Sequence, residues 1–283
     1  MGLDRPLQVF AASKERRVLR YFQSLVAEAG NTFEWTVLGS RVWGTQDPEN
    51  LKAILSTEEK CSFYPKSYSA TDAHSYCTAF SHEVRRVVTG SLIGDGIFTQ
   101  DGAEWRHSRS LLKPSLFQKH YHDATLFEEH VDNLISRIAT ERIIDLQPLF
   151  FSLTLDITTS FLFGKSVYTL KPNQGQAEKE FSEAFRYAQV YVARRYQLGR
   201  LCWILNNKKY QESCKTVHAY IDGIVQEAMR EKNSLEVNCE EFRGQLLGEL
   251  VLDVQDPKQA RDHLIHLLLS GRDTSSCLLS WTL

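Results

Sequence analysis

The long apolar stretch Asp262–Leu283 constrains the fold more than any other part of the chain. Apolar residues dominate its first turns and resume from Cys277 to Trp281. A surface helix keeps a wide polar face, so this composition predicts a helix buried through the middle of a domain. Asp256 followed by Pro257 predicts where the helix begins, because Asp caps helices well and Pro suits the first helical position.

A polar hexad, Ser270–Ser275, interrupts the apolar pattern at the midpoint of this helix. In one interpretation, the Asp273 carboxylate beside the Thr274 hydroxyl relays protons to a molecule bound in a groove. Gly271 would then let a flat ligand approach the helix closely. In the alternative, the helix ends near Gly271, and Asp273 or Thr274 caps a second helix. The hexad by itself leaves both interpretations open.

Composition excludes several classes of protein. Hydrophobic residues make up 42% and charged residues 24% of the 283 residues, as in a soluble globular protein with a core. A net charge of −2 gives no general attraction to nucleic acid, so we expect no nucleic-acid partner. The six cysteines form no Cys-x-x-Cys pair, which argues against a disulfide framework or a zinc site. His263 and His266, with Asp262, are the one alternative metal site, and we predict no metal ligands elsewhere.

No segment of the sequence has the pattern of a signal peptide or a membrane anchor. Met1–Phe10 never reaches a hydrophobic core of signal length. The most apolar run, Leu149–Phe163, contains Asp156 and is too short to span a bilayer. We therefore expect this chain to be soluble and cytoplasmic.

Hydrophobic periodicity predicts a mostly helical protein with one small β element near its beginning. Residues 33–37 and 41–43 alternate around a Gly-Ser turn and predict a hairpin. Residues 57–90 show neither a helical nor a strand period, which predicts a long divergent loop or a segment of faulty sequence. The predicted helices cover about 11–29, 47–55, 102–112, 126–138, 148–163, 181–192, 210–225, 242–251 and the terminal stretch.

Trp105 and Arg109 are a second candidate site, because they lie one helical turn apart on the same face. An indole N–H and a guanidinium can both donate to a carboxylate, and Arg does so as a bidentate, charged donor. The alternative is an ordinary amphipathic helix with a partly buried Trp and solvated arginines.

These two stretches, in this order, resemble motifs of the cytochrome P450 family. The terminal hexad is similar to the family's oxygen-binding motif, Ala/Gly-Gly-x-Asp/Glu-Thr-Thr/Ser, from which Ser270 departs at the first position. Trp105-x-x-x-Arg109 resembles the motif that holds a haem propionate on the family's C helix. The turn Gly94–Phe98 resembles the approach to that helix in fungal alkane and fatty-acid hydroxylases. The hairpin and the Asp47–Asn50 helix start are similar to the family's early sheet and B helix.

The resemblance implies a mainly α, incomplete cytochrome P450 fold, with residues 1–283 as one partial domain that ends in the central oxygen-binding helix. It implies a haem-thiolate monooxygenase that uses molecular oxygen to hydroxylate a lipophilic substrate, such as a long-chain alkane or fatty acid. An NADPH-dependent P450 reductase would be its partner, at the endoplasmic reticulum membrane. The aromatic-rich helices around Phe181 and Tyr191 and the segment Leu201–Leu205 would form a substrate channel and a membrane-facing lid.

The resemblance also assigns roles to single residues. Trp105 and Arg109 would bind a haem propionate, and Gly271 would let the terminal helix lie close to the haem face. Asp273 and Thr274 would deliver protons during oxygen activation.

In the family, a Glu-x-x-Arg pair and then the Phe-x-x-Gly-x-Arg-x-Cys-x-Gly loop, which provides the iron's thiolate ligand, follow the oxygen-binding helix, and neither follows it in the 283 residues. Cys277 follows Thr274 on the same predicted helix and lies in no such loop. Because this chemistry needs the thiolate, we expect these residues to be inactive by themselves. The alternatives are a non-catalytic remnant of the family or a helical protein-interaction module.

Overall fold

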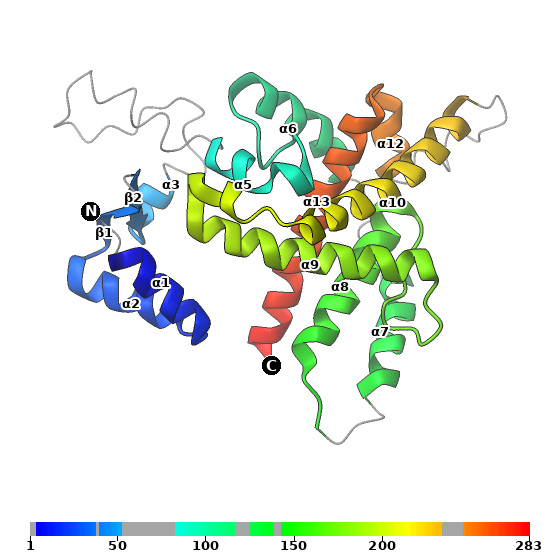
Figure 1. The fold of residues 1–283 in the computed structure, drawn as a ribbon. Coiled ribbons are helices and arrows are strands. Elements are labelled where there is room, and N and C mark those ends of the chain that lie inside the picture. Colours follow the sequence, from blue (N-terminus) through cyan, green and yellow to red (C-terminus); the bar gives the residue numbers. More distant parts are fainter. Residues whose placement is uncertain (1–3, 38–39, 53–82, 117–124, 139–142, 234–245) are drawn as a thin grey trace. The chain divides into compact units, whose positions relative to one another are not determined.

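The computed structural model describes residues 4–37, 40–52, 83–116, 125–138, 143–233 and 246–283 (Figure 1). The chain divides into two compact units, Met1–Glu83 and Val84–Leu283. Both are built mainly from helices, and the strands of the described residues form one two-stranded sheet. The predicted fold class is therefore confirmed, and the single partial domain over residues 1–283 stays a prediction.

The first unit consists of helices and the predicted hairpin. The two strands pair antiparallel, with Thr32 opposite Thr45 and Val37 opposite Ser40. The turn residues 38–39 lie outside the described part. The single helix predicted over residues 11–29 is wrong, because left-handed backbone at Arg16, with φ of 56°, separates two helices. The elements are α1 (Asp4–Lys14), α2 (Val18–Ala29), β1 (Thr32–Val37), β2 (Ser40–Thr45) and α3 (Pro48–Lys52).

Asp47 caps α3 as its sequence predicted. Its carboxylate accepts hydrogen bonds from the N–H groups of Glu49 (2.9 Å) and Asn50 (3.2 Å). The Asn50 side chain donates to the hydroxyls of Thr32 (3.0 Å) and Thr45 (3.2 Å), one on each strand. The same short helix is thus fixed to both strands of the hairpin.

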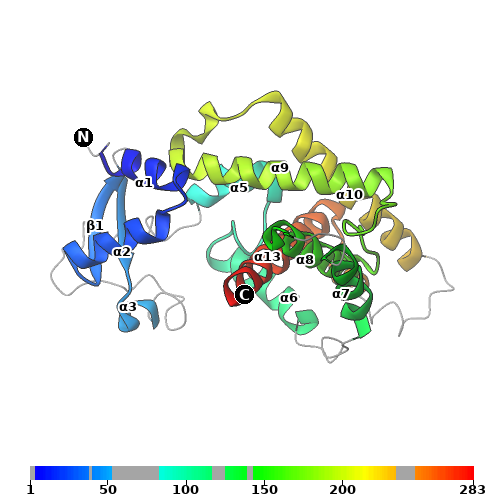
Figure 2. The ribbon, with the colours of Figure 1, turned by 90° about the horizontal axis from the view of Figure 1, so that it is seen from below.

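The second unit is helical throughout its described length. Helix α13 packs mainly along α8 and α10 and also contacts α12 (Figures 1 and 2). The elements are α5 (Glu83–Ile93), α6 (Gly102–Leu116), α7 (Thr125–Ile138), α8 (Leu146–Phe163), α9 (Gln176–Leu198), the 3-10 helix η3 (Gly199–Ile204), α10 (Lys208–Asn233), α12 (Leu246–Asp253) and α13 (Pro257–Thr282).

Helix α13 is continuous from Pro257 to Thr282, so the alternative of a helix break at Gly271 is wrong. Asp256 caps it by accepting from the Lys258 N–H at 3.1 Å. A Cβ added at Gly271 would lie 2.9 Å from the side chain of Thr158 on α8. The glycine therefore lets two core helices approach each other closely, which explains why it does not end the helix.

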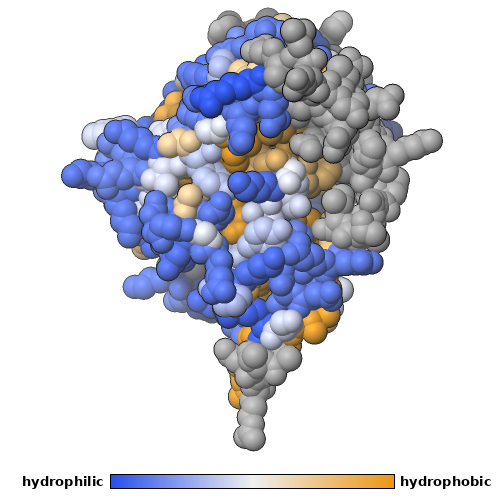
Figure 3. Space-filling view, turned by 90° about the vertical axis from the view of Figure 1, so that its right-hand side faces the viewer, coloured by the Kyte–Doolittle hydropathy of each residue, from blue (hydrophilic) through white to orange (hydrophobic). Residues whose placement is uncertain are grey.

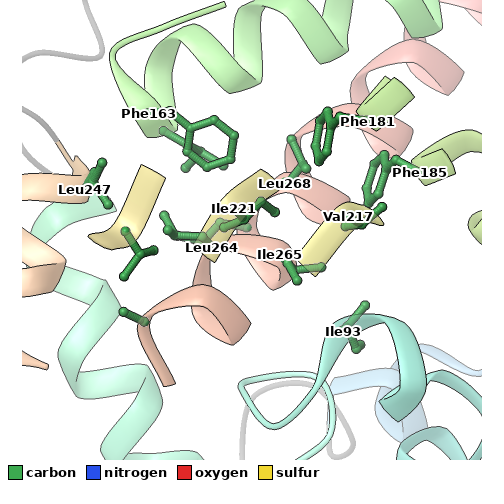
Figure 4. Close-up of a cluster of buried hydrophobic side chains, with 14 of the residues drawn as sticks. Ile93, Phe163, Phe181, Phe185, Val217, Ile221, Leu247, Leu264, Ile265 and Leu268 are labelled. Carbon is green, nitrogen blue, oxygen red and sulfur yellow. The ribbon is translucent and has the colours of Figure 1, made fainter. Parts of the chain in front are cut away.

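The hydrophobic core gathers side chains from six helices around α13 (Figure 4). The Phe181 ring stacks on Phe185 within α9, with centroids 5.9 Å apart, and on Tyr220 of α10 at 4.4 Å. Leu264, Ile265 and the other core residues of α13 are fully buried, and burying each such side chain contributes about 1.5–3 kcal/mol. Most of the coloured part of the face drawn in Figure 3 is hydrophilic, with hydrophobic patches between the hydrophilic residues.

Helix α8 is the one described helix that is long and apolar enough to cross a membrane, and half of it is buried inside the protein. Its Asp156 carboxylate is buried and accepts hydrogen bonds from the N–H (2.7 Å) and hydroxyl (2.8 Å) of Thr169 and from the Leu170 N–H (3.1 Å). Burial raises the pKa of this carboxyl, and the bonds from Thr169 and Leu170 oppose the rise. These contacts are those of a core helix.

Two details of the predicted helices differ from the structure. Residues 83–93 form α5, so the absence of helical structure predicted for 57–90 is wrong over 83–90, while residues 53–82 lie outside the described part. The helix predicted over residues 102–112 is longer in the structure, because α6 continues through Pro114 to Leu116. Pro114 has no backbone N–H to donate, so α6 lacks one backbone hydrogen bond in its last turn.

Candidate functional site

Trp105 and Arg109 lie together on α6, as their spacing predicted. The Arg109 guanidinium is 5.3 Å from the centre of the Trp105 ring. Trp105 is half-buried and Arg109 is exposed, and Arg109 makes no hydrogen bond or ion pair within the described part of the chain. The ring contacts the guanidinium through a cation–π interaction, which leaves the guanidinium's N–H donors open. The pair can therefore bind an anion such as a carboxylate.

Asp273 is held by a polar network between α13 and α9. One of its carboxylate oxygens accepts from the Gln189 amide at 2.9 Å, and the other accepts from Arg272 at 2.9 Å. Burial raises the pKa of the Asp273 carboxyl, and Arg272 and Gln189 oppose that rise. A carboxyl with a raised pKa takes up and releases protons more readily near neutral pH, which suits a proton relay.

Arg272 occupies the buried side of the same network. Its guanidinium lies 4.9 Å from the ring centre of Phe151 and 5.7 Å from that of Phe185. It donates to the Gln189 carbonyl oxygen as well as to Asp273, while burial lowers its pKa. Gln189 thus bridges the two charged residues by accepting from one and donating to the other.

Thr274 points away from this network. Its side chain is exposed, and its hydroxyl donates to the backbone carbonyl of Ser270 at 2.6 Å. Cys277, Leu278 and Trp281 are also exposed along this part of α13, with Leu278 69% and Trp281 76% accessible. Thr274 therefore opens onto an accessible, largely apolar face, on which a flat ring could lie.

The structure brings the predicted site residues together only in part. Trp105 contacts Arg109, whereas the side chains of Asp273 and Thr274 have different partners. Among the described residues, no hydrogen bond or ion pair joins the α6 pair to the α13 pair. A side chain at Gly271 would point toward Thr158 of α8. This contact explains the glycine without any ligand. The contact of Gly271 with a haem stays a prediction.

The sequence contains no signal for the role of Gln189, and it suggested a different role for Asp262 and His266. Gln189 gives no local signal, because it lies 84 residues from the carboxylate that it holds. Asp262 and His266 were considered as metal ligands, but the described residues contain no group of three or more side chains arranged to hold a metal ion. They bind the turn before α6 instead.

Replacing Gln189 with Leu is expected to destabilise the protein by about 1–3 kcal/mol, because it leaves Arg272 and Asp273 short of a partner in a partly buried site. Urea unfolding at pH 7 measures the change. Val190→Ala, at the next and exposed position of α9, is the control and should shift stability by less than about 0.5 kcal/mol. Equal effects of the two substitutions would contradict the bridging role of Gln189.

Comparison with known proteins identifies the family. The sequence model of the family Cytochrome P450 matches residues 7–283. The chain belongs to the cytochrome P450 family. A cytochrome P450 of Arthroderma benhamiae is 34% identical over 287 residues, which cover 100% of this chain and 51% of the relative. Cytochrome P450 52A5 of Candida maltosa is 38% identical, with 99% and 52% covered. Cytochrome P450 monooxygenase g430 of a Fusarium species is 31% identical, with 99% and 50% covered.

Solved cytochrome P450 structures share the fold. The haem domain of cytochrome P450DA superposes with a TM-score of 0.67 at 20% identity, over 94% of this chain and 55% of that one. The cytochrome P450 CYP102L1 gives a TM-score of 0.60 at 19% identity, over 90% and 55%. The chain spans about half the length of the P450 relatives that it matches. The family predicted from the two motifs is confirmed.

Proposed function

We propose that this chain is part of a haem-thiolate monooxygenase that hydroxylates a lipophilic substrate, such as a long-chain alkane or fatty acid. The open donors of Trp105 and Arg109, on the same unit as the Asp273-Thr274 motif, carry the proposal. A relative from Fusarium is named a monooxygenase, which supports the reaction class. Molecular oxygen would be the second substrate, and an NADPH-dependent P450 reductase the partner.

The residues present fit a haem. Arg109 has a stacked guanidinium without a partner among the described side chains, and a haem propionate would give it one. The exposed face of α13 around Thr274 and Leu278 offers apolar contact to the ring. When bound, the haem supplies the activation of molecular oxygen, while the protein provides orientation and protons.

The proton path that we propose starts at Asp273. Burial raises the pKa of its carboxyl, so the oxygen that faces Gln189 would take up a proton more readily than an ordinary carboxylate does. Rotation of the Asp273 side chain would bring this proton toward the Thr274 hydroxyl. Thr274 in turn would give up its bond to Ser270 and donate on the accessible face. Gln189 and Arg272 would fix the resting position of the acid.

The exposed segment around η3 supports the proposed lid. Trp203 is 67% and Ile204 58% exposed, and Leu201 is also exposed. We propose that these side chains line the path by which the lipophilic substrate enters, or contact the surface of the endoplasmic reticulum membrane. Phe181 and Tyr191 are buried in the core, so they do not line an accessible channel.

Haem titration tests the function. Arg109→Leu is expected to weaken haem binding about 10-fold to 100-fold, since a charge-assisted hydrogen bond contributes about 1.5–3 kcal/mol. Arg106→Leu removes an equal charge from the same helix and is the matched control, with an expected change below about 3-fold. Absence of saturable haem binding by the unaltered chain would overturn the proposal.

A carbon monoxide spectrum distinguishes the enzyme from the non-catalytic alternative. The 283 residues contain no thiolate loop, so we propose that they do not give the thiolate-type absorption band by themselves. A version of the protein that includes such a loop should give the band and hydroxylate fatty acids. If it gives neither, the non-catalytic remnant or helical interaction module is the better assignment.

A further inference from the structure

The turn Gly94–Phe98, between α5 and α6, is seated directly on α13. The Asp95 N–H donates to the Asp262 carboxylate at 3.1 Å, and the Phe98 N–H donates to His266 Nδ1 at 3.1 Å. The Phe98 ring stacks on the His266 ring, with centroids 5.4 Å apart and planes 15° from parallel. Two buried side chains of α13 thus bind backbone groups about 170 residues earlier in the sequence, at separations of 167 and 168.

Two glycines make this seat possible. A Cβ at Gly94 would lie 2.1 Å from the Asp262 carboxylate, and φ at Gly94 is +68°, in the left-handed region. A Cβ at Gly96 would lie 2.9 Å from His266 Nε2. Both glycines are required at these positions because side chains of α13 already fill the space.

The turn is internally braced and joined to α6. The Thr99 hydroxyl accepts from the Gly96 N–H at 2.9 Å and donates to the Gly94 carbonyl at 3.0 Å. The Gln100 side chain accepts from the Ser108 hydroxyl at 2.6 Å. Ser108 is buried and directly precedes Arg109 on α6. A continuous path of short contacts therefore runs from α13 to the helix that carries Trp105 and Arg109.

The carboxylate at the other end of this path is itself fixed. Asp262 accepts from Arg261 at 3.0 and 2.7 Å, and Arg261 also contacts Asp222 of α10 at 3.3 Å. His266 is fully buried, and its Nδ1 must be unprotonated to accept from Phe98. Neither group can move without breaking contacts in the core.

We propose that Asp262 and His266 are positioning residues for the anion-binding face of α6. They fix the Gly94–Phe98 turn, and through Gln100 and Ser108 the turn sets the position of Trp105 and Arg109 relative to α13. The part of this inference that concerns haem rests on the proposed function. The seating of the turn does not, so the two can fail separately.

Three variants of α13 test the inference. His266→Leu removes the acceptor of the Phe98 N–H. His266→Asn restores an acceptor at the same place, because Asn Oδ1 lies near the position of His Nδ1. His263→Leu is the control, because His263 is equally buried on the same helix and has no hydrogen-bond partner in the described part of the chain. Hydrogen exchange of the Phe98 amide measures whether the turn stays bound to α13. Haem titration measures the affinity of the anion-binding face that carries Trp105 and Arg109.

His266→Leu should speed exchange of the Phe98 amide at least 10-fold and weaken haem binding about 10-fold, a change equivalent to one hydrogen bond. His266→Asn should restore both, and His263→Leu should change neither more than about 3-fold. Unchanged exchange in His266→Leu would overturn the seat. Faster exchange with unchanged haem affinity, or equal losses in His263→Leu, would overturn the positioning role. If neither the unaltered chain nor any variant binds haem, the proposed function fails. Exchange of the Phe98 amide then tests by itself whether His266 holds the turn on α13.

Discussion

The two histidines that α13 buries in their neutral form are expected to contribute a loss of about 6 kcal/mol of stability when the pH is lowered from 7 to 4. Burial is the main cause that lowers the pKa of His263 to about 4 and that of His266 to about 3. His107 adds to the effect at His263, and His263 and Arg85 add to it at His266. Within the described residues, both nitrogens of His263 and Nε2 of His266 lack a hydrogen-bond partner, while backbone groups of Gly94 and Ile93 oppose the lowering of the His266 pKa.

Acid lowers the stability because the folded and unfolded chains protonate these two histidines at different pH values. The unfolded chain takes up protons near pH 6.5, whereas the folded chain cannot do so until about pH 4 for His263 and pH 3 for His266. The stabilising contribution is complete above pH 6.5 and is lost as the pH falls toward the folded pKa values. At about 1.4 kcal/mol per unit, each histidine loses about 3 kcal/mol between pH 6.5 and 4. A loss of this total size is a large part of the stability of an ordinary domain.

Buried carboxyls act in the opposite direction. The pKa values of Asp156, Asp262 and Asp273 are raised by burial, so the folded protein takes up those protons more readily as the pH falls. Variants are therefore needed to isolate the histidines.

Urea unfolding of the unaltered chain and of His263→Leu at pH 7, 5.5 and 4.5 measures the histidine share. At pH 7 the substitution should be neutral or stabilising by up to about 1 kcal/mol, because it replaces a buried imidazole whose two nitrogens have no partner. At pH 4.5 it should be stabilising by about 2–3 kcal/mol. Parallel pH profiles of the two proteins would show that His263 is not buried in the neutral form.

Gly94→Ala is expected to cost about 2–5 kcal/mol, which is a large effect for a single methyl group. Two causes add. The left-handed backbone, with φ of +68°, disfavours a side chain by about 1–2 kcal/mol. The new methyl group would also overlap the Asp262 carboxylate and break its bond to the Asp95 N–H, which costs a further ~1–3 kcal/mol.

Gly102→Ala is the matched control. Gly102 has a similar left-handed φ of +58°, but nothing lies within 4 Å of an added Cβ. We expect a loss of about 1 kcal/mol there, from backbone strain alone. Chemical denaturation of both variants separates strain from overlap.

A second-site change tests the cause. In an Asp262→Ala background the overlap is gone, so Gly94→Ala should cost no more than Gly102→Ala. If Gly94→Ala remained as costly in that background, the contact with Asp262 would not be the reason for the glycine.

Local signals in the sequence determined the elements and the family. Alternating residues around Gly39-Ser40 predicted the hairpin, and Asp256-Pro257 predicted the start of α13. The spacing of Trp105 and Arg109 placed them on one face of a helix, where the structure has them. These features depend on residues a few positions apart, so periodicity and capping are enough to find them.

The sequence did not predict helix boundaries that depend on the backbone conformation of one residue or on tertiary packing. The break between α1 and α2 at Arg16 depends on one left-handed residue, which no apolar pattern reports. Residues 83–93 are helical although their composition shows no clear helical period, because Val88, Leu92 and Ile93 are buried in the core. Tertiary packing thus overrides a weak local preference.

The interpretation of the terminal helix changed most between sequence and structure. The sequence determined that Asp262–Leu283 is a central helix with a polar hexad at its midpoint, and that the chain belongs to the cytochrome P450 family. Only the tertiary structure decided that Gly271 faces Thr158, that Gln189 holds Asp273, and that Asp262 and His266 seat the glycine turn. The physical reason is that each of these contacts joins residues that are between 84 and 168 positions apart, or on separate helices, and the identity of a distant partner leaves no trace in local periodicity.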